Sequence, residues 1–285
     1  MTRVAIAGAI AAGLLSCALA LAATPKSRSA PARGFAATLS WEDGRTEISD
    51  YVGITFRRGQ PCSTRARLVI GTVNLFSETL AESDEGPIPG RTLEALKASF
   101  LADDSAGGDS HHEMASIVLD RTTLTPRKET AARIESAGIR FVRVGPKKGR
   151  LTHEDWSSRD ADREQPVTWP GNDRPHVWTD ALPVTLRAWA AAGSVTTAQD
   201  VYLLPSPNAG LSPGAAAQAA PATISAADGG DVSVPAGRFA TRRFVVTTGR
   251  ASDTLWFDRA SPHALLRLHT AAGTRLELQK TTRAR

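Results

Sequence analysis

The clearest catalytic string in the sequence is Gly210-Leu-Ser212-Pro-Gly214, which fits the G-x-S-x-G pattern of serine hydrolases. In those enzymes the serine stands on a sharp turn between a buried strand and a packed helix, so that its hydroxyl is exposed to substrate. Here Pro205 and Pro207 precede the string, and the residues that follow are mostly alanine. The surroundings favour a loop, and a hydrolase that uses Ser212 is kept as the second alternative function.

Histidines and carboxylates are too scattered in the sequence to predict a metal site. The histidine cluster is His111-His112-Glu113, and adjacent side chains on a strand point to opposite faces, so the two imidazoles cannot chelate one ion. Paired carboxylates such as Asp103-Asp104 fall in polar segments where we expect nothing to desolvate them and shift their pKa. We therefore predict no catalytic residue, no metal and no cofactor.

Aromatic residues suggest binding rather than catalysis. The chain has six Trp and two Tyr, and the inward aromatics of a curved β-sheet can line an apolar cavity. Trp41, Phe239 and Trp256 fall in predicted strands, so we select them as the candidate ligand-binding residues. The alternative is that they are ordinary core side chains.

The N-terminal residues resemble a signal peptide. Arg3 is followed by a run of apolar residues up to Leu15, and Ala20-Leu-Ala22 has the small residues that a signal peptidase selects. Residues 1–22 are therefore predicted to be a signal peptide, and residues 23–33, rich in Pro, Lys, Ser, Arg and Ala, a flexible leader. These features predict a periplasmic or otherwise exported protein.

Cys17 leaves two forms of export open. Leu14-Leu15-Ser16-Cys17 resembles a lipobox, in which the cysteine is acylated and would anchor the protein at the outer membrane. The apolar run continues past Cys17, which favours a plain signal-region cysteine instead. Cys62 then remains as the single cysteine of the mature chain, so stability must come from a packed core and not from an internal disulfide.

The formal net charge of +5 does not predict a nucleic-acid partner. Basic residues are mostly arginines, interleaved with Asp and Glu as singles or pairs such as Arg57-Arg58. The sequence has no dense basic helix and no nucleic-acid-binding motif. We expect a solvated, arginine-rich surface, with weak attraction to anionic envelope lipid as the alternative.

Short runs of β-branched, aromatic and leucine residues, separated by Gly, Pro, Ser or Asp, predict consecutive antiparallel strands. The pattern is clearest near the C-terminus, where the predicted strands cover residues 231–239, 241–246, 253–258, 263–268 and 275–280. Earlier strands are predicted at residues 35–41, 51–56, 67–76, 117–121, 139–144 and 150–153. Residues 155–175 are predicted to be a long loop or a pair of irregular strands.

Two short helices are predicted. Thr92 would cap a helix over residues 93–101, and a second helix would cover residues 179–192. Residues 205–221, mostly Pro, Ala, Gly and Ser, are expected to form a mobile insertion. Residues 34–285 are thus predicted to be a single, mainly β domain: a curved antiparallel sheet or partly open barrel with one or two short helices.

The C-terminal strands resemble a family of bacterial envelope proteins of unknown function. The shared elements are a PAG-x-F element at Pro235-Ala-Gly-Arg-Phe239, an L-W-x-x-D strand that is one residue shorter here, Leu255-Trp-Phe-Asp258, and a final basic-apolar strand at Leu265-Leu-Arg-Leu268. Asp120-Arg-Thr-Thr-Leu-Thr-Pro126 also resembles the family's D-x-x-T-L-x-P strand and turn. The turn would send Phe239 into the core, with Trp256 as its cross-strand partner.

The resemblance implies a signal peptide, a curved sheet distantly similar to lipoprotein-carrier half-barrels, and no established enzyme activity. We therefore interpret the chain as an exported, non-enzymatic cell-envelope protein that binds an apolar ligand, a lipid or an acylated partner protein, in a concave sheet. The first alternative is a structural or partner-docking module with a filled core.

Overall fold

The computed structural model describes residues 45–284, except residues 58, 107–108, 137, 149, 159–161, 193–197 and 208–216. Cys17, Trp41 and Ser212 lie outside the described residues. So do the predicted signal peptide, the leader and the strand at residues 35–41. These remain predictions.

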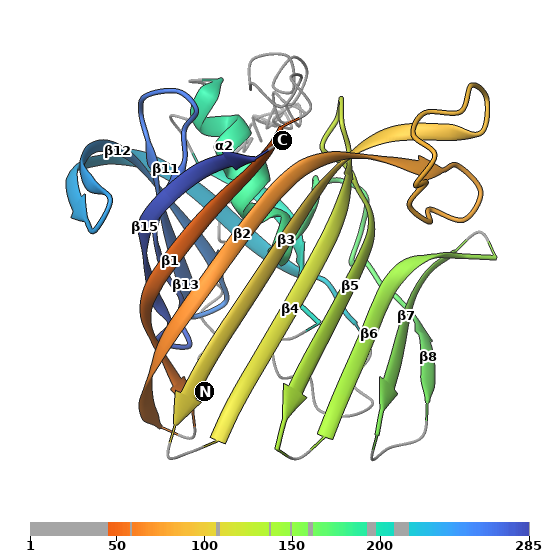
Figure 1. Ribbon diagram of the computed structural model, residues 1–285, viewed down its shortest axis with the longest axis horizontal. Coiled ribbons are helices and arrows are strands. Elements are labelled where there is room, and N and C mark those ends of the chain that lie inside the picture. The colour runs from red at the N-terminus through yellow and green to blue at the C-terminus, as the bar shows by residue number, and fades with distance from the viewer. Residues whose placement is uncertain are drawn as a thin grey trace, which may run out of the picture.

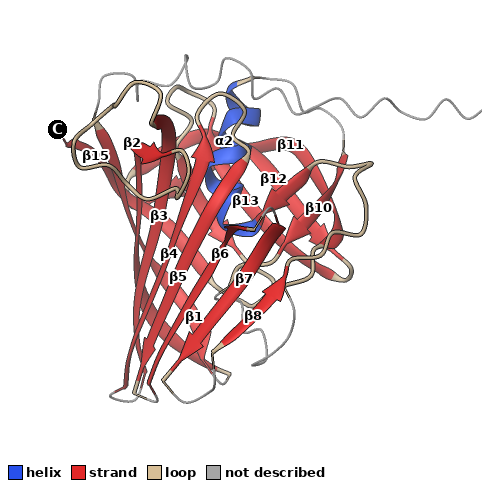
Figure 2. Cartoon of the chain, turned by 90° about the vertical axis from the view of Figure 1, so that its right-hand side faces the viewer, coloured by secondary structure: helices blue, strands red, loops and turns tan. Residues whose placement is uncertain are grey.

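The described residues form one curved sheet of fifteen strands with a helix on its concave side (Figures 1 and 2). The first eight strands are β1 (Thr46–Arg57), β2 (Gln60–Phe76), β3 (Thr92–Ala106), β4 (Asp109–Asp120), β5 (Pro126–Glu135), β6 (Gly138–Lys147), β7 (Arg150–Ser157) and β8 (Arg163–Pro166). The others are β9 (His176–Trp178), β10 (Gln199–Leu204), β11 (Ala220–Val234), β12 (Gly237–Thr248), β13 (Ala251–Asp258), β14 (Leu265–His269) and β15 (Arg275–Ala284). The helix α2 (Leu182–Ala191) follows a single 3-10 turn, η2 (Thr179–Ala181). The predicted mainly β fold with a curved sheet is confirmed.

The strand order divides the sheet into two wings. The N-terminal wing is β1 to β8 and the C-terminal wing is β9 to β15, each built from strands that are neighbours both in the chain and in the sheet. The wings join where β1 pairs with β15, from Thr46 opposite Ala284 to Ile54 opposite Arg275. Neighbouring strands pair antiparallel, except that β9 and β10 are parallel.

The two edge strands, β8 and β9, do not pair with each other in the described ladder. One short bridge lies near them: the Thr168 N–H donates to the Ala217 carbonyl at 3.3 Å, and the Thr168 carbonyl accepts the Ala219 N–H at 3.0 Å. The sheet is therefore a strongly curved, open one, and not a closed barrel.

Strand alternation decides which side chains face the helix. In β2 the side chains of Thr64, Ala66 and Leu68 are buried, whereas Arg65 and Arg67 between them are exposed, as a two-residue period requires. The buried set faces the concave side, where α2 packs against β13 and η2 against β4. Burial of this apolar face is the main favourable contribution to folding.

The helix α2 is buried on almost every side, including Leu186, Ala188 and Trp189. The predicted helix over residues 179–192 is confirmed by η2 and α2 together. The predicted helix over residues 93–101 is wrong, because this segment lies within β3 and pairs along its length with β2 and β4. Those two ladders outweigh a helical propensity that is only a weak preference.

Other parts of the predicted outline change in detail. Strand β5 was not predicted, and β8 lies in the segment for which irregular strands were one expectation. The predicted insertion at residues 205–221 overlaps the start of β11 at Ala220. Among the described residues, no helix is both long enough and apolar enough to cross a membrane.

Candidate functional site

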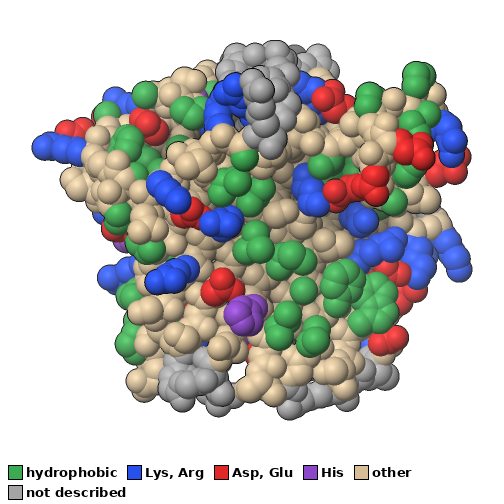
Figure 3. Space-filling view, viewed as in Figure 1, with side chains coloured by type: hydrophobic (Ala, Val, Ile, Leu, Met, Phe, Trp, Pro, Cys, Tyr) green, Lys and Arg blue, Asp and Glu red, His purple; other side chains and the backbone are tan. Residues whose placement is uncertain are grey.

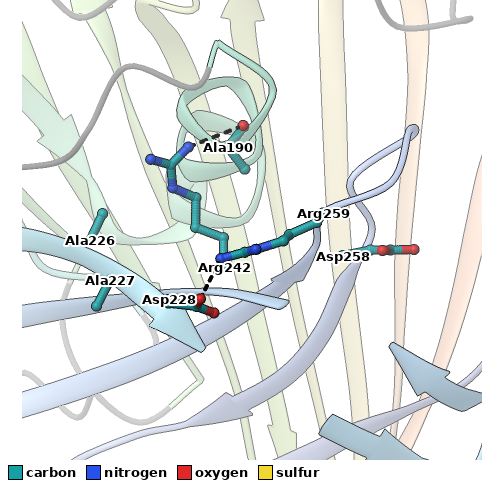
Figure 4. A pocket seen from close by; sticks show the side chains of 7 residues that line it. All are labelled: Ala190, Ala226, Ala227, Asp228, Arg242, Asp258 and Arg259. Atoms are coloured by element: carbon teal, nitrogen blue, oxygen red, sulfur yellow. Dashed lines mark hydrogen bonds and ion pairs between the residues drawn. The ribbon is translucent and has the colours of Figure 1, made fainter. Parts of the chain in front are cut away.

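A pocket of about 470 Å³ lies on the concave side, at the C-terminal end of α2 (Figure 4). Three strands, a turn and the helix build it. The residues that line it are Ala190 of α2, Ala226, Ala227 and Asp228 of β11, Arg242 of β12, Asp258 of β13, and Arg259 just after β13. We call it the arginine pocket, because Arg242 and Arg259 carry its positive charge.

Arg242 reaches the pocket because of its place in β12. It shares the inward face with the buried Phe244 and Val246, and its neighbours across the sheet are Asp228 and Phe257. Its Nη1 donates to the Ala190 carbonyl oxygen at 3.5 Å, near the last turn of α2 (Figure 4). A cation is favourable there because the C-terminal end of a helix carries partial negative charge.

Burial, and then the positive charge of Arg259, lowers the pKa of Arg242. The guanidinium stays protonated, because arginine does not lose its proton in proteins.

Arg259 is held by a carboxylate and a carbonyl. Its Nη2 lies 2.8 Å from Asp228 Oδ2, and its Nε donates to the Thr241 carbonyl at 3.2 Å. Asp228 Oδ1 accepts the Gly230 N–H at 2.9 Å, and that N–H together with the charge of Arg259 lowers the pKa of Asp228. Asp228 is therefore an ionised anchor for Arg259 and a weak candidate for a general base.

Asp258 lines the rim but does not neutralise the arginines. Its carboxylate points away from both guanidinium groups in Figure 4 and accepts the Ala260 N–H at 2.9 Å. The pocket thus presents two guanidinium groups beside the small apolar side chains of Ala190 and Ala226, whereas the Ala227 side chain points to the other side of β11 (Figure 4). Guanidinium groups bind carboxylates and phosphates through paired hydrogen bonds, so the arrangement is suited to an anion.

The residues selected from the sequence lie elsewhere. Trp256 is on the opposite face of β13 from the buried Leu255 and Phe257. The Arg267 guanidinium lies 5.9 Å from the centre of its ring, and the His269 ring centre lies at 4.9 Å. Trp256 also packs against the main core and does not line the arginine pocket.

Phe239 is half-buried and packs against the main core. The predicted pairing of Phe239 with Trp256 is wrong: Phe239 lies opposite Val232, and Trp256 lies opposite Arg243 and Arg267. The reason is that β12 extends beyond β13, so Phe239 has a neighbour on β11 alone among the described strands.

A buried ion pair fixes the helix in the sheet. Arg187 of α2 donates from Nη1 and Nη2 to Glu47 Oε1 and Oε2 of β1 at 2.7 and 2.9 Å, and both side chains are 2% exposed. The Arg187 Nε donates to the Pro262 carbonyl at 2.6 Å. This pair therefore links α2 to the joint between the wings and to the turn before β14.

The N-terminal wing also holds two buried titratable groups that have no such ion pair. Burial, and then Asp180 of η2, raises the pKa of Glu129 well above its ordinary value, which favours the neutral carboxyl group. Burial lowers the pKa of His153, two strands away on the same face. Both groups were missed in the sequence, where their only signal is an inward place in a strand.

The histidine cluster behaves as predicted from strand geometry. His111 faces inward, with Nε2 2.9 Å from Glu113 and Nδ1 3.2 Å from Glu135, whereas His112 faces outward with Nδ1 2.6 Å from Asp103. The expectation of a solvated Asp103-Asp104 pair is half wrong, because Asp104 is buried and accepts two hydrogen bonds from Arg57. Within the described ranges, no group of three or more His, Cys, Asp or Glu residues could hold a metal ion.

The fold and the pocket define a class of protein: an open, curved β-sheet with a buried helix on its concave side and an arginine-lined pocket. No family model matches the chain, and no curated protein matches its sequence significantly. Among solved structures, the chain is similar to a beta-barrel-like protein of domain of unknown function DUF1849 from Brucella abortus, with a TM-score of 0.47 and 9% identity over 85% of this chain and 98% of that one. That protein's name states no activity and no ligand.

Proposed function

We propose that the chain is an exported, non-enzymatic cell-envelope protein that binds an amphiphilic anion, a lipid or an acylated partner, with the anionic group in the arginine pocket. The observation that carries the proposal is the convergence of Arg242 and Arg259, from different elements, on one pocket that also has the small side chains of Ala190 and Ala226. A volume of about 470 Å³ is within the range of small-molecule sites.

The proposal assigns the charged part of the ligand, not its apolar chain, to this pocket. Leu186 and Trp189 of α2 fill the adjoining concave face and are almost fully buried. The small side chains of Ala190 and Ala226 leave room for a head group while still offering apolar contact. The site therefore differs from the aromatic-lined cavity expected from Trp41, Phe239 and Trp256.

The test begins with the ligand that the protein carries. Full-length protein is purified from the envelope of its own kind of host without detergent, and native mass spectrometry with solvent extraction identifies bound molecules. We expect an anionic amphiphile. A short-chain, water-soluble phosphatidylglycerol then serves as the probe for calorimetry of the purified chain.

Arg242→Gln is expected to weaken binding of that probe by about tenfold, because one charge-assisted contact is lost. Arg238→Gln is the matched control, since Arg238 lies on the same strand but its side chain is 73% exposed and pairs with Asp231 outside the pocket. Arg259→Gln serves as a second variant if Arg242→Gln alters the unfolding midpoint. Equal affinities of wild type and both pocket variants would show that the proposal is wrong.

A structural or partner-docking module is the second candidate, because α2 fills so much of the concave face. A clean apoprotein mass together with no probe binding would favour it. The serine hydrolase alternative is tested separately: ester turnover that is lost in Ser212→Ala would revive it.

A further inference from the structure

The outer face of the N-terminal wing carries two apolar clusters, of which one is covered by a loop and the other is exposed. The first cluster is Leu75, Ala95 and Val118, which are buried because residues 77–91 fold over them and contribute Leu80. The second, which we call the outer patch, has no such cover among the described residues. It consists of Leu101, Met114, Ile134, Ile139, Phe141 and Trp156.

The outer patch is continuous across five strands. Leu101, Met114, Phe141 and Trp156 lie in one cross-strand row, with Ala132 between Met114 and Phe141, and Ile134 lies opposite Ile139 in the next row. The Phe141 and Trp156 rings are 5.4 Å apart. Ile139 is 55% exposed and Ile134 45%. Figure 3 shows these apolar side chains gathered on the lower part of the face, and contiguous exposed apolar surface marks interaction sites.

A groove of about 170 Å³ adjoins the outer patch and shares Met114 with it. Its polar lining comes from the rows of strand residues directly above the patch, Lys97, Ser99, Ser116, Lys128 and Thr130, and from Glu82 of the covering segment. Ser99 Oγ and Ser116 Oγ lie 2.9 Å apart. Hydroxyl groups and lysines together can hold the oxygens of a phosphate group.

Lys128 is the strongest feature of this groove. Its Nζ donates to the Leu80 carbonyl at 3.4 Å, and no described carboxylate forms an ion pair with it. Burial, and then the nearby Arg143, lowers the pKa of Lys128. By contrast, Lys97 is paired with Glu82 at 2.5 Å and Arg143 with Glu154 at 3.3 Å.

We propose that the outer patch and the Lys128 groove together dock on a bilayer surface that contains anionic phospholipid. Ser116 comes two residues after Met114 on β4, and Thr130 comes two residues before Ala132 on the antiparallel strand β5. Two residues along a strand span about 7 Å. A phosphate in the groove would thus lie next to hydrocarbon on the patch, which is the order of groups at a phospholipid interface. A free phosphate would use the groove and leave the patch exposed.

Vesicle co-sedimentation of the full chain tests this surface. We expect binding to vesicles of phosphatidylcholine mixed with phosphatidylglycerol, weaker binding to phosphatidylcholine alone, and loss of binding at high salt. Lys128→Gln is expected to lower partitioning to the mixed vesicles about fivefold, the contribution of one basic residue near an anionic surface. Lys128→Arg keeps the charge and should retain binding.

The apolar part is tested with the double variant Ile139→Ser and Phe141→Ser, which is expected to lower partitioning by at least about tenfold, since both side chains would leave hydrocarbon. Phe56→Ser is the matched control: Phe56 is 43% exposed but lies on β1, away from the patch. Circular dichroism confirms that each variant is folded. If the double variant is not, Ile134→Ser replaces it.

No binding to mixed vesicles, or equal binding by the wild type, Lys128→Gln and the patch variant, would overturn the proposal. Self-association in sedimentation velocity that the patch variant abolishes, without vesicle binding, would make the patch an interface between two copies and also overturn it. The arginine pocket is tested independently, because Arg242→Gln should bind vesicles normally and Lys128→Gln should bind the water-soluble probe normally.

Discussion

The two wings of the sheet share one backbone geometry but bury different chemistry on the concave side. In the C-terminal wing the inward side chains include Phe244, Leu255 and Leu276, all almost fully buried. In the N-terminal wing the buried set on this side includes charged or titratable groups, namely Glu47, Asp104, His111, Glu129, His153 and Asp155. The C-terminal wing is stabilised by apolar burial, whereas the N-terminal wing depends on each polar group having the right partner or protonation state.

The largest effect is expected where α2 meets the joint between the wings. Arg187→Ala removes the partner of Glu47 and leaves a carboxylate uncompensated in the core, so the free energy of unfolding should fall by about 3 to 5 kcal/mol. Urea denaturation of the full chain measures it. The double variant Glu47→Gln with Arg187→Met should recover part of the loss, and a single-variant change below about 1 kcal/mol would contradict the assigned role.

A smaller loss is expected from the apolar wing. Leu276, 2% exposed on β15 and opposite Leu268, should cost about 3 kcal/mol when replaced by Ala, because a cavity remains. The same denaturation experiment compares the wings directly. Unlike Arg187→Ala, this variant should show a loss that does not change with salt, and a marked salt dependence would argue against a purely apolar contribution.

The smallest effect concerns the protonation of Glu129. Below the ordinary pKa of 4.5 both the folded and the unfolded state hold the proton. As the pH rises from there toward the raised folded pKa, the unfolded state loses the proton first, so wild-type stability declines across this window. Glu129→Gln carries no titrating proton there and should be more stable than the wild type near pH 7.

Unfolding midpoints of wild type and Glu129→Gln between about pH 4 and pH 8 measure this difference. His153 is present in both proteins, so its own titration cancels in the comparison. Parallel pH profiles of the two proteins would mean that Glu129 is not held in its neutral form.

The difference between the wings also explains how far the sequence could predict the fold. The strands predicted at residues 253–258 and 275–280 correspond to β13 and β15, because Leu255-Trp-Phe257 is a run of large apolar residues and Leu276 and Leu278 alternate with polar residues. In the N-terminal wing the inward positions of β5 are occupied by Glu129, Ala131 and Arg133. Without a row of large apolar side chains, the two-residue period is hidden and the strand was missed.

The Asp120–Pro126 segment gave a correct strand and turn for a local reason. Asp120 Oδ1 accepts the N–H groups of Thr122 and Thr123 at 3.0 and 2.9 Å, and Leu124 adopts a positive φ of 55°. A short polar side chain that satisfies backbone donors a few residues ahead is a turn signal that needs no distant partner. Such a feature can be predicted from a short stretch of sequence.

The arginine pocket could not be predicted in this way. In the sequence, Arg242-Arg243 looks like any other basic pair of a solvated surface. Only its spacing of two and four residues from Phe244 and Val246 indicates that Arg242 faces inward. Its surroundings come from the end of α2, from β11 and from the turn after β13. The pocket depends on how those distant segments pack, which a single sequence does not specify.

The joint between β1 and β15 has a consequence for assembly of the chain. Each wing is a contiguous segment, and the joint brings together Thr46 and Ala284, at opposite ends of the described chain. Contacts so distant in sequence form slowly, because a long loop must close first. A polypeptide cut between β8 and β9, near residues 171–174, would yield two fragments that each retain their local hairpins. We expect these fragments to reassociate through fragment complementation, and a circular permutant opened at the same place to fold.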